Sequence, residues 1–544
     1  MYSDRENVNI VTELLVRHGV KHVVVCPGSR NAPLVHNFHA HPSLVCHPVT
    51  DERSAGFMAL GIAQQDRTCP VAVCVTSGSA LLNLMPAVAE ASYQHCGFVV
   101  VSADRPRHWI DQLDGQTLPQ EDALGRFVAK SVSVAEPHDD EERWYCNRLV
   151  NEAFVALYRT DRPVQINVPI AEPLFSFSTK ELPPQRVVRY IPWDNEPWRN
   201  AVMRMVEKSS RPMVVMGQMP CGSVPADYAM QVAEKVVMLY EPLAIDEMPR
   251  CLTDEMLAAM TGDVNRFMPD LVLYLGNNTV SKRLRQFLRR LPVTCNVVMV
   301  DEEGELKDVS MHTDYVLHGR TEDVVRDVFM SWLHKDKCCE DDYLDAWKGL
   351  YHEAARQLVD SSTDDLQAMA VKYFEDEYGE DEVVHYANST AIRLGCRFAS
   401  NHYIYCNRGL NGIEGSLSTA AGASLAMQEE GNVYCVIGDL SFFYDENALW
   451  QTQLTGNLRI LLLNNGGGSI FRTLKGLDAS PARDVFVAAQ HGFSAEGVCR
   501  QFGLTYRMVD STDTLADGIQ WLGSVESKRP VVLEVKSPDT LKEE

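Results

Sequence analysis

Short apolar runs that end in turn residues recur along the chain and predict buried parallel strands. Residues 22–26, 71–75 and 98–102 are almost entirely apolar, and a small or polar residue follows each run closely. Uninterrupted runs of this length are typical of strands that helices cover on both faces. Residues 165–168 add a further strand candidate, so residues 1–190 predict a first α/β domain.

The pattern continues through the rest of the chain. A second α/β domain is predicted over residues 195–335, with strand candidates at residues 213–216, 236–240, 271–275 and 297–300. Residues 336–380 predict a charged helical connector, whose acidic clusters at 340–342 and 375–377 are expected to be solvated. Residues 381–544 predict a third α/β domain. The expected fold class is therefore α/β, with three αβα domains built on parallel sheets.

Two apolar runs in residues 433–468 predict a strand–helix–strand unit. The first run ends at Gly438 and Asp439, a helical pattern follows, and the second run ends at Asn464 and Asn465. Such a unit joins parallel strands, whose carboxyl ends meet at one edge of the sheet. Folds of this kind bind ligands at that edge. We therefore expect Asp439 and Asn465 to lie side by side.

The residue types at this edge indicate a metal site. A carboxylate, an amide oxygen and a glycine carbonyl such as that of Gly467 form a hard oxygen set. This set suits Mg²⁺ that carries a phosphate ligand, and Mn²⁺ is possible. Each dipeptide alone is common in ordinary turns, so the strand–helix–strand context is what favours the metal and phosphate site.

Composition and charge narrow the function classes. The 544 residues are 45% hydrophobic and 23% charged, as in soluble globular proteins. A net charge of −24 argues against nucleic acid and anionic membrane partners, and no apolar stretch has the length of a membrane span. The N-terminal residues lack a signal-peptide pattern. The fifteen cysteines are scattered without zinc spacing, so we expect a reducing, cytoplasmic compartment.

The Gly-Asp and Asn-Asn pairs, with their spacing, resemble the metal–diphosphate signature of thiamine diphosphate-dependent enzymes. Three αβα blocks agree with the pyrimidine-binding, central and diphosphate-binding domains of that superfamily. The resemblance implies a cofactor bound between the first domain of one subunit and the last domain of its partner. A homodimer, possibly paired into a homotetramer, is therefore expected. It also implies that Ile413 wedges the cofactor into a bent shape, although plain core packing remains open for this residue.

Glu52 is the candidate catalytic acid. It stands where a predicted strand runs into a helix expected over residues 54–63. A glutamate there is often only a residue that complements the helix dipole, and Asp51 is a local alternative. The position matches the glutamate that, in the family, hydrogen-bonds the far nitrogen of the aminopyrimidine and promotes carbanion formation. The resemblance therefore assigns the cofactor-activating role to Glu52.

Four longer segments, at residues 26–34, 407–422, 438–447 and 464–471, narrow the resemblance. They resemble the 2-succinyl-5-enolpyruvyl-6-hydroxy-3-cyclohexene-1-carboxylate (SEPHCHC) synthase family of menaquinone biosynthesis. That family decarboxylates 2-oxoglutarate on thiamine diphosphate and adds the resulting succinyl-semialdehyde carbanion to isochorismate, a 1,4-addition. The resemblance covers the first and last domains well and the central domain thinly.

Because both implied substrates are dicarboxylates, cationic and polar side chains in the matching loops become candidates for substrate binding. Arginine suits this task because its planar fork binds a carboxylate at two points. The candidates are Ser29, Arg30, Gln116, Lys282, Arg283, Ser389, Arg393 and Arg408. Ser389 and Arg393 are expected to share one helix face. Surface cations, and serines that only cap helices, remain the alternatives. Ile470 and Phe471 would form an apolar wall near the acceptor substrate, or simply pack in the core.

One departure distinguishes the chain from pyruvate decarboxylase relatives, which use a pair of histidines to protonate the reacting group. Here Trp109 follows His108, and the sequence contains no adjacent histidine pair. A site without such proton donors favours carbon–carbon bond formation. The alternatives are another thiamine diphosphate-dependent 2-oxoacid decarboxylase, an acetolactate synthase-like ligase, a flavin-bearing variant, and a cofactor-binding protein without catalysis.

Overall fold

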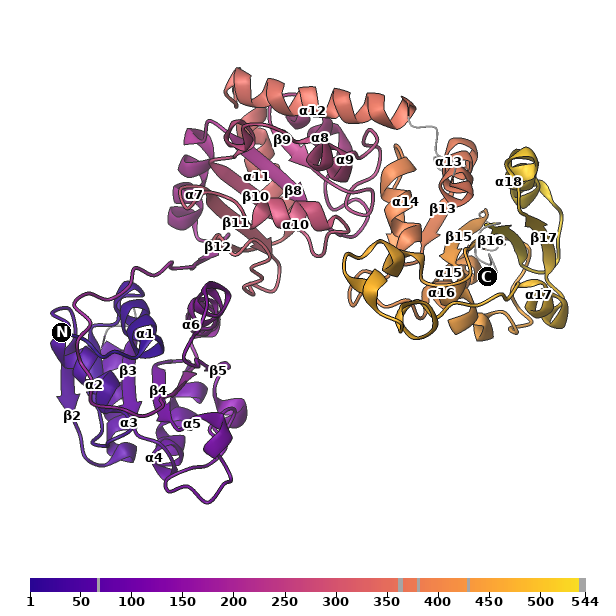
Figure 1. Ribbon diagram of the computed structural model, residues 1–544. Helices are drawn as coiled ribbons and strands as arrows, with labels where there is room; N and C mark the ends of the chain where they lie inside the picture. The colour runs from indigo at the N-terminus through magenta and orange to yellow at the C-terminus, as the bar shows by residue number, and fades with distance from the viewer. Residues whose placement is uncertain (66–68, 361–364, 379–381, 428–430, 538–544) are drawn as a thin grey trace. The chain divides into compact units, whose positions relative to one another are not determined.

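The computed structural model describes residues 1–65, 69–360, 365–378, 382–427 and 431–537. The fold consists of three six-stranded parallel sheets with interleaved helices, which confirms the expected α/β class (Figure 1). The chain divides into two compact units. The first contains Met1–Ala201 and Asn296–Arg320, and the second contains Val202–Cys295 and Thr321–Glu544.

The first sheet has the strand order β2-β1-β3-β4-β6-β5. Its strands are β1 (His22–Val25), β2 (Val45–Pro48), β3 (Val71–Val75), β4 (Val99–Asp104), β5 (Lys130–Ser133) and β6 (Val164–Pro169). Its helices are α1 (Glu6–Arg17), α2 (Ala32–Ala40), α3 (Glu52–Gln65), α4 (Ser79–Asn83), α5 (Met85–Tyr93) and α6 (Asp140–Thr160). The four strands predicted for this domain are confirmed, with ends that shift by one or two residues.

Alternate residues of the central strands face opposite layers of helices. Val23 and Val25 pack in the apolar core that includes α1 and α6, whereas Val24 packs in the core that includes α3 and α5. All three side chains are at most 6% exposed. Because both faces are covered, the strand reads as a continuous apolar run rather than as an alternating one.

Helix α6 shows how the sequence sets the ends of an element. Asp139 caps its start, since its carboxylate accepts a hydrogen bond from the backbone N–H of Glu142 at 2.8 Å. Acidic residues fill the first turn, where they complement the helix dipole. Asp161 ends the helix in the left-handed region, at φ 51°. These local signals set where α6 begins and ends.

The second sheet has the order β7-β12-β11-β10-β8-β9. Its strands are β7 (Arg189–Pro192), β8 (Pro212–Met216), β9 (Val237–Leu239), β10 (Leu271–Leu275), β11 (Asn296–Asp301) and β12 (Thr313–His318). The helices in this part of the chain are α7 (Glu196–Lys208), α8 (Ala226–Ala233), α9 (Thr253–Ala259), α10 (Lys282–Leu288), α11 (Thr321–Leu333) and α12 (Asp341–Asp360). The four predicted strands are confirmed, and β7 begins before the expected boundary at residue 195.

The connector is helical, as expected, but it is not fully solvated. Helix α13 (Leu366–Tyr378) follows α12 and buries Val371 and Phe374. Glu375, which was expected to be solvated, is also buried, and its carboxylate accepts hydrogen bonds from the Tyr386 hydroxyl and from His402 Nε2, the latter at 2.7 Å. The prediction for the acidic cluster at 375–377 was wrong for Glu375, because the helix carries this residue on its buried face and the other two acidic residues on its exposed face.

The third sheet has the order β14-β13-β15-β16-β18-β17. Its strands are β13 (Val383–Tyr386), β14 (Ile404–Cys406), β15 (Val433–Gly438), β16 (Leu458–Asn464), β17 (Thr505–Val509) and β18 (Val531–Lys536). Its helices are α14 (Thr390–Phe398), α15 (Ser416–Ala426), α16 (Asp439–Tyr444), α17 (Glu496–Phe502) and α18 (Leu515–Ser524). In chain order this arrangement repeats that of the first sheet. In both sheets the strand order reverses beside the first strand, which is where such folds bind ligands.

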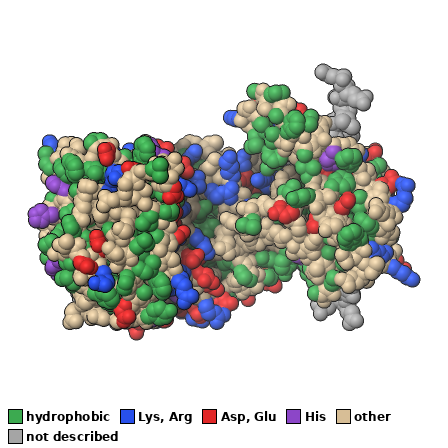
Figure 2. All heavy atoms as spheres, turned by 90° about the horizontal axis from the view of Figure 1, so that it is seen from below, with side chains coloured by type: hydrophobic (Ala, Val, Ile, Leu, Met, Phe, Trp, Pro, Cys, Tyr) green, Lys and Arg blue, Asp and Glu red, His purple; other side chains and the backbone are tan. Residues whose placement is uncertain are grey.

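The surface mixes charges of both signs with hydrophobic side chains over the face drawn in Figure 2. Within the described part of the chain, no helix combines the length and the apolar character needed to cross a bilayer.

Candidate active site

The strand–helix–strand unit brings Asp439 and Asn465 together, as predicted. Strands β15 and β16 pair in parallel, with Gly438 opposite Leu463. The backbone N–H of Asn465 donates to Asp439 Oδ2 at 3.0 Å. The connection between the two strands contains a short helix of six residues, α16, followed by a 3-10 turn and loops.

Backbone donors surround the Asp439 carboxylate. Gly467 N–H donates to Oδ2 at 3.0 Å, and Leu440 N–H donates to Oδ1 at 2.7 Å. Burial raises the pKa of Asp439 above its usual value, and the hydrogen bond from Gly467 opposes this effect. A nearby cation would offset the cost of burying this charge.

The glycines after β16 form a tight turn that only glycine can make. Gly466 has φ 74° and Gly467 has φ 145°. A Cβ atom on Gly467 would lie 2.7 Å from the Ala488 carbonyl oxygen. The Gly467 carbonyl accepts a hydrogen bond from Ser469 N–H at 3.1 Å and retains a second lone pair. The turn therefore holds the Gly467 backbone against Asp439, and the Gly467 carbonyl keeps a lone pair for a cation.

The Asn465 side chain completes an oxygen set. Its Nδ2 donates to Gln367 Oε1 at 3.2 Å and to Ser469 Oγ at 3.1 Å. Its Oδ1 is buried, and no group among the described residues donates a hydrogen bond to it. A buried acceptor without a donor is the arrangement expected of a ligand to a cation. The residues therefore fit Mg²⁺ or Mn²⁺ held by Asp439, Asn465 and the Gly467 carbonyl.

His491 also lies at this edge of the sheet, and it was not among the residues predicted from the sequence. Its Nε2 lies 3.5 Å from Asp439 Oδ2, and its ring stacks on Phe493. The residue belongs to a loop whose backbone bonds to the glycine turn, because His491 N–H donates to the Gly466 carbonyl at 2.9 Å.

Three apolar candidates lie on elements near these motifs. Ile413 precedes α15 and is partly buried. Ile470 and Phe471 lie in a 3-10 helix, Ser469–Thr473, directly after the glycine turn, and both are partly buried. Partial exposure leaves each of them able to contact a ligand.

Glu52 begins α3 after strand β2, as predicted. Its Oε2 accepts a hydrogen bond from Asn83 Nδ2 at 3.0 Å, and the residue is partly exposed. Asp51, the alternative, caps the helix instead, because its Oδ1 accepts the Ser54 N–H at 2.9 Å. That bond lowers the pKa of Asp51. The carboxyl of Glu52 is not used in capping.

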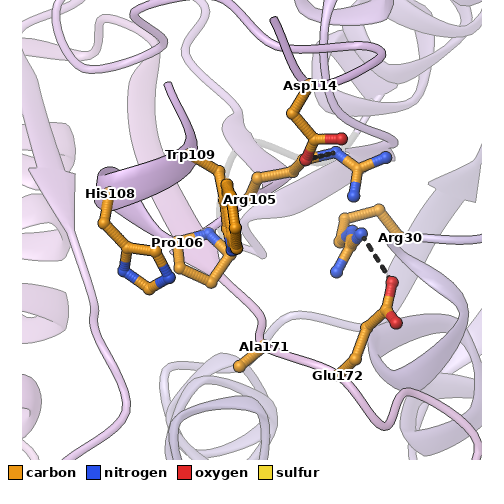
Figure 3. A pocket seen from close by; sticks show the side chains of 8 residues that line it. All are labelled: Arg30, Arg105, Pro106, His108, Trp109, Asp114, Ala171 and Glu172. Carbon is orange, nitrogen blue, oxygen red and sulfur yellow. Dashed lines mark hydrogen bonds and ion pairs between the residues drawn. The ribbon is translucent and has the colours of Figure 1, made fainter. Parts of the chain in front are cut away.

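A cavity of about 440 Å³ lies in the first unit at the carboxyl edge of its sheet (Figure 3). Arg30 is buried there, donates to the Ile170 carbonyl at 2.9 Å and pairs with Glu172 at 3.3 Å. Arg105 enters the same cavity, and its Nε lies 3.1 Å from Asp114 Oδ2. Burial and the neighbouring Arg105 cation lower the pKa of Arg30. The guanidinium groups of Arg30 and Arg105 therefore line the same cavity.

Arg105 was missed although its signal was present. It follows the apolar run of β4, just as Arg30 follows that of β1, so the strand-end rule would have found it. Gln116 lies two residues beyond Asp114, is exposed and has φ 56°, with its backbone against Gly78. Ser29 is exposed beside Arg30.

The candidates in the second unit fall into two groups. Arg408 is buried, and its guanidinium donates to Asn388 Oδ1 at 3.0 Å and to the Thr279 carbonyl at 3.2 Å. Thr279 lies just before Lys282 and Arg283, both exposed at the start of α10, and Arg283 pairs with Asp254. Arg408 thus contacts the segment that leads into α10, the helix that begins with these two cations.

The prediction that Ser389 and Arg393 share one helix face is wrong. Helix α14 begins at Thr390, and Ser389 precedes it with φ 75°, outside helical geometry. Its side chain makes no capping hydrogen bond. Arg393 is exposed on the helix.

Comparison with known proteins identifies both end domains. Residues 6–124 match the family "Thiamine pyrophosphate enzyme, N-terminal TPP binding domain", and residues 387–535 match "Thiamine pyrophosphate enzyme, C-terminal TPP binding domain". Among curated relatives, the 2-succinyl-5-enolpyruvyl-6-hydroxy-3-cyclohexene-1-carboxylate synthase of Bacteroides fragilis is 40% identical over 98% of this chain and 96% of its own length. The enzymes of the same name from Bacteroides thetaiotaomicron and Desulfotalea psychrophila are 38% and 31% identical, over 99% and 98% of this chain and 97% and 98% of their own lengths. The chain therefore belongs to the family of thiamine diphosphate-dependent SEPHCHC synthases.

Proposed function

We propose that this protein decarboxylates 2-oxoglutarate and joins the remaining four-carbon unit to isochorismate by 1,4-addition, as a step of menaquinone biosynthesis. The observation that carries the proposal is the clamp of Asp439 and Asn465, found in a chain with full-length similarity to SEPHCHC synthases. Mg²⁺, or Mn²⁺, would be held by Asp439, Asn465 and the Gly467 carbonyl, and would anchor the diphosphate.

Thiamine diphosphate, when bound, supplies the electron sink that permits loss of carbon dioxide from a 2-oxoacid. Glu52 would hold a proton against the far nitrogen of the aminopyrimidine ring. This role is supported because Asp51, and not Glu52, caps the helix. Ile413 would hold the bound cofactor in a bent shape, and Ile470 and Phe471 would form an apolar wall near the acceptor substrate.

Cationic groups select dicarboxylic substrates in a protein that carries a net charge of −24. Arg30 and Arg105 are both fixed by carboxylates at one cavity, which leaves further N–H donors for a substrate carboxylate (Figure 3). Ser29 and Gln116 assist in the same domain. Lys282, Arg283, Ser389, Arg393 and Arg408 bind substrate from the second unit. Arg408 acts with only part of its guanidinium, because two of its nitrogens bond to protein oxygens.

A simple 2-oxoacid decarboxylase is the second candidate, and the Arg30 cavity disfavours it. His108 and Trp109 both line this cavity, with ring centroids 5.3 Å apart. Among the described residues that line the cavity, His108 is followed by Trp109 and not by a second histidine. This favours carbon–carbon bond formation over protonation.

A homodimer with active sites at the subunit interface is part of the proposal, and a homotetramer remains possible. Large hydrophobic side chains are exposed near the third sheet, where a partner subunit would cover them: Tyr444, Trp450, Phe486 and Phe493 are 67%, 60%, 82% and 69% exposed. We place the enzyme in the cytoplasm, since none of its fifteen cysteines forms a disulfide.

Two experiments test this proposal. Release of carbon dioxide from 2-oxoglutarate should require thiamine diphosphate and Mg²⁺, and activity without either one would contradict the cofactor assignment. Co-expression of Glu52→Gln and Asp439→Ala chains should give mixed dimers with one intact site and partial activity, whereas each variant alone should be inactive. No recovery in isolated mixed dimers would contradict a site shared between subunits.

A further inference from the structure

Gln367 lies in the connector, outside both sequence motifs, yet it reaches the metal site. It is the second residue of α13 and is only 4% exposed. Its backbone N–H donates to Asp365 Oδ1 at 3.0 Å, which fixes the start of the helix. Helix α13 packs on the third sheet and its helices through buried residues such as Val371 and Phe374. The position of Gln367 is therefore set by the fold rather than by a loop.

The Gln367 side chain contacts Asn465, the proposed metal ligand, directly. Asn465 Nδ2 donates to Gln367 Oε1 at 3.2 Å and to Ser469 Oγ at 3.1 Å. Both N–H groups of the amide are then engaged, and the amide oxygen points away from them. That oxygen is buried, and no described residue donates to it.

We propose that Gln367 is a positioning residue that turns the Asn465 amide so that its oxygen, and not its nitrogen, faces the bound cation. This inference rests on the proposed metal site. An amide nitrogen cannot bind a hard cation, so a reversed Asn465 would lose a ligand and direct N–H groups at positive charge. Partners that orient a metal ligand in this way strongly affect metal affinity.

The two partners of Asn465 differ in how well they select its orientation. The Ser469 hydroxyl can accept or donate, so it tolerates either face of the amide. Gln367 can also present nitrogen instead of oxygen if its own amide turns, and among the described residues no group accepts from its Nε2. A carboxylate at position 367 could only accept, so it would enforce the productive orientation. A thioether of similar length could not accept well and would enforce nothing.

The test compares Gln367→Met with Gln367→Glu in the full-length protein, with Mn²⁺ as the probe. Free Mn²⁺ is followed by electron paramagnetic resonance in the presence of thiamine diphosphate and without substrate. We expect Gln367→Met to bind Mn²⁺ about 10-fold to 100-fold more weakly. Gln367→Glu should bind it at least as tightly as the unmodified protein. High Mg²⁺ should restore the activity of Gln367→Met.

Controls separate this role from packing and from failure of the site itself. Gln357→Met, at an exposed position of α12, should leave Mn²⁺ affinity unchanged. Equal weakening in the Met and Glu variants, with lowered melting temperatures, would show a packing role and overturn the inference. Unchanged affinity in both would overturn it while leaving the proposed function intact. If Asp439→Ala also bound Mn²⁺ normally, the proposed metal site itself would be wrong, and the inference with it.

Discussion

Gln120 should be essential for the loop that carries Arg105 and Gln116, although it contacts no substrate. The residue is 1% exposed and joins three parts of the first unit. Its Oε1 accepts the Gly78 N–H at 2.7 Å, and its Nε2 donates to the Ala103 carbonyl at 3.1 Å and to Asn167 Oδ1 at 2.8 Å. One side chain thus ties the loop to the ends of β3, β4 and β6.

The cost of Gln120→Leu follows from the groups that it would leave behind. Gly78 N–H would lose its acceptor, and an unsatisfied buried donor costs about 1–3 kcal/mol. Asn167 Oδ1 would keep its bond from Ser102 Oγ, so it and the Ala103 carbonyl lose only net bond energies of about 1 kcal/mol each. Together we expect a loss of about 3–5 kcal/mol in the free energy of unfolding.

Urea unfolding, followed by intrinsic fluorescence, measures this loss. The matched control is Gln112→Leu, at an exposed position of the same loop, where the side chain donates a hydrogen bond to the adjacent Asp111 carbonyl. It should change stability by less than about 0.5 kcal/mol. The KM for the dicarboxylate that we propose binds at Arg30 and Arg105 should rise in Gln120→Leu, while the affinity for thiamine diphosphate should stay unchanged. Equal effects of the two variants on stability or KM would refute the reasoning.

Three further outcomes follow from individual side chains. Glu52→Gln should keep cofactor affinity but lose about 10²-fold to 10⁴-fold in turnover, because only proton transfer is disabled; unchanged turnover would reject the role. Arg393→Ala should raise the KM of one dicarboxylate about 10-fold or more without weakening Mg²⁺-dependent cofactor binding; equal losses would indicate structural damage. Burial lowers the pKa of His18 to about 4 from 6.5, so the neutral form stabilises the fold above pH 6.5, and about 3 kcal/mol is lost as the pH falls to 4. His18→Gln should flatten that part of the pH–stability curve, and an unchanged curve would contradict the assignment.

Central strands were predictable because both of their faces are buried. Strands β1, β3, β4, β15 and β16 read as apolar runs, and each was found close to its predicted range. Strand β18 was missed because Glu534 interrupts its apolar run. That glutamate is 0% exposed and is satisfied by Asn464, Ser494, Tyr506 and the Ala495 N–H. Such a network depends on tertiary contacts that no local pattern signals.

Some parts of the candidate site were likewise predictable from the sequence, and other parts were not. The proximity of Asp439 and Asn465 followed from the rule that parallel strands end at one edge. Gln367 could not be found, because it lies 98 positions from Asn465 in the sequence and within a charged segment. Ser389 was misplaced because a spacing of four indicates a shared face only if both residues are helical.

The most direct test of the central claim identifies the product formed from 2-oxoglutarate with and without isochorismate. The purified protein, supplied with thiamine diphosphate and Mg²⁺, is incubated under both conditions, and the products are analysed by mass spectrometry. We predict that isochorismate is consumed and that 2-succinyl-5-enolpyruvyl-6-hydroxy-3-cyclohexene-1-carboxylate accumulates. Succinic semialdehyde as the sole product in the presence of both substrates would contradict it.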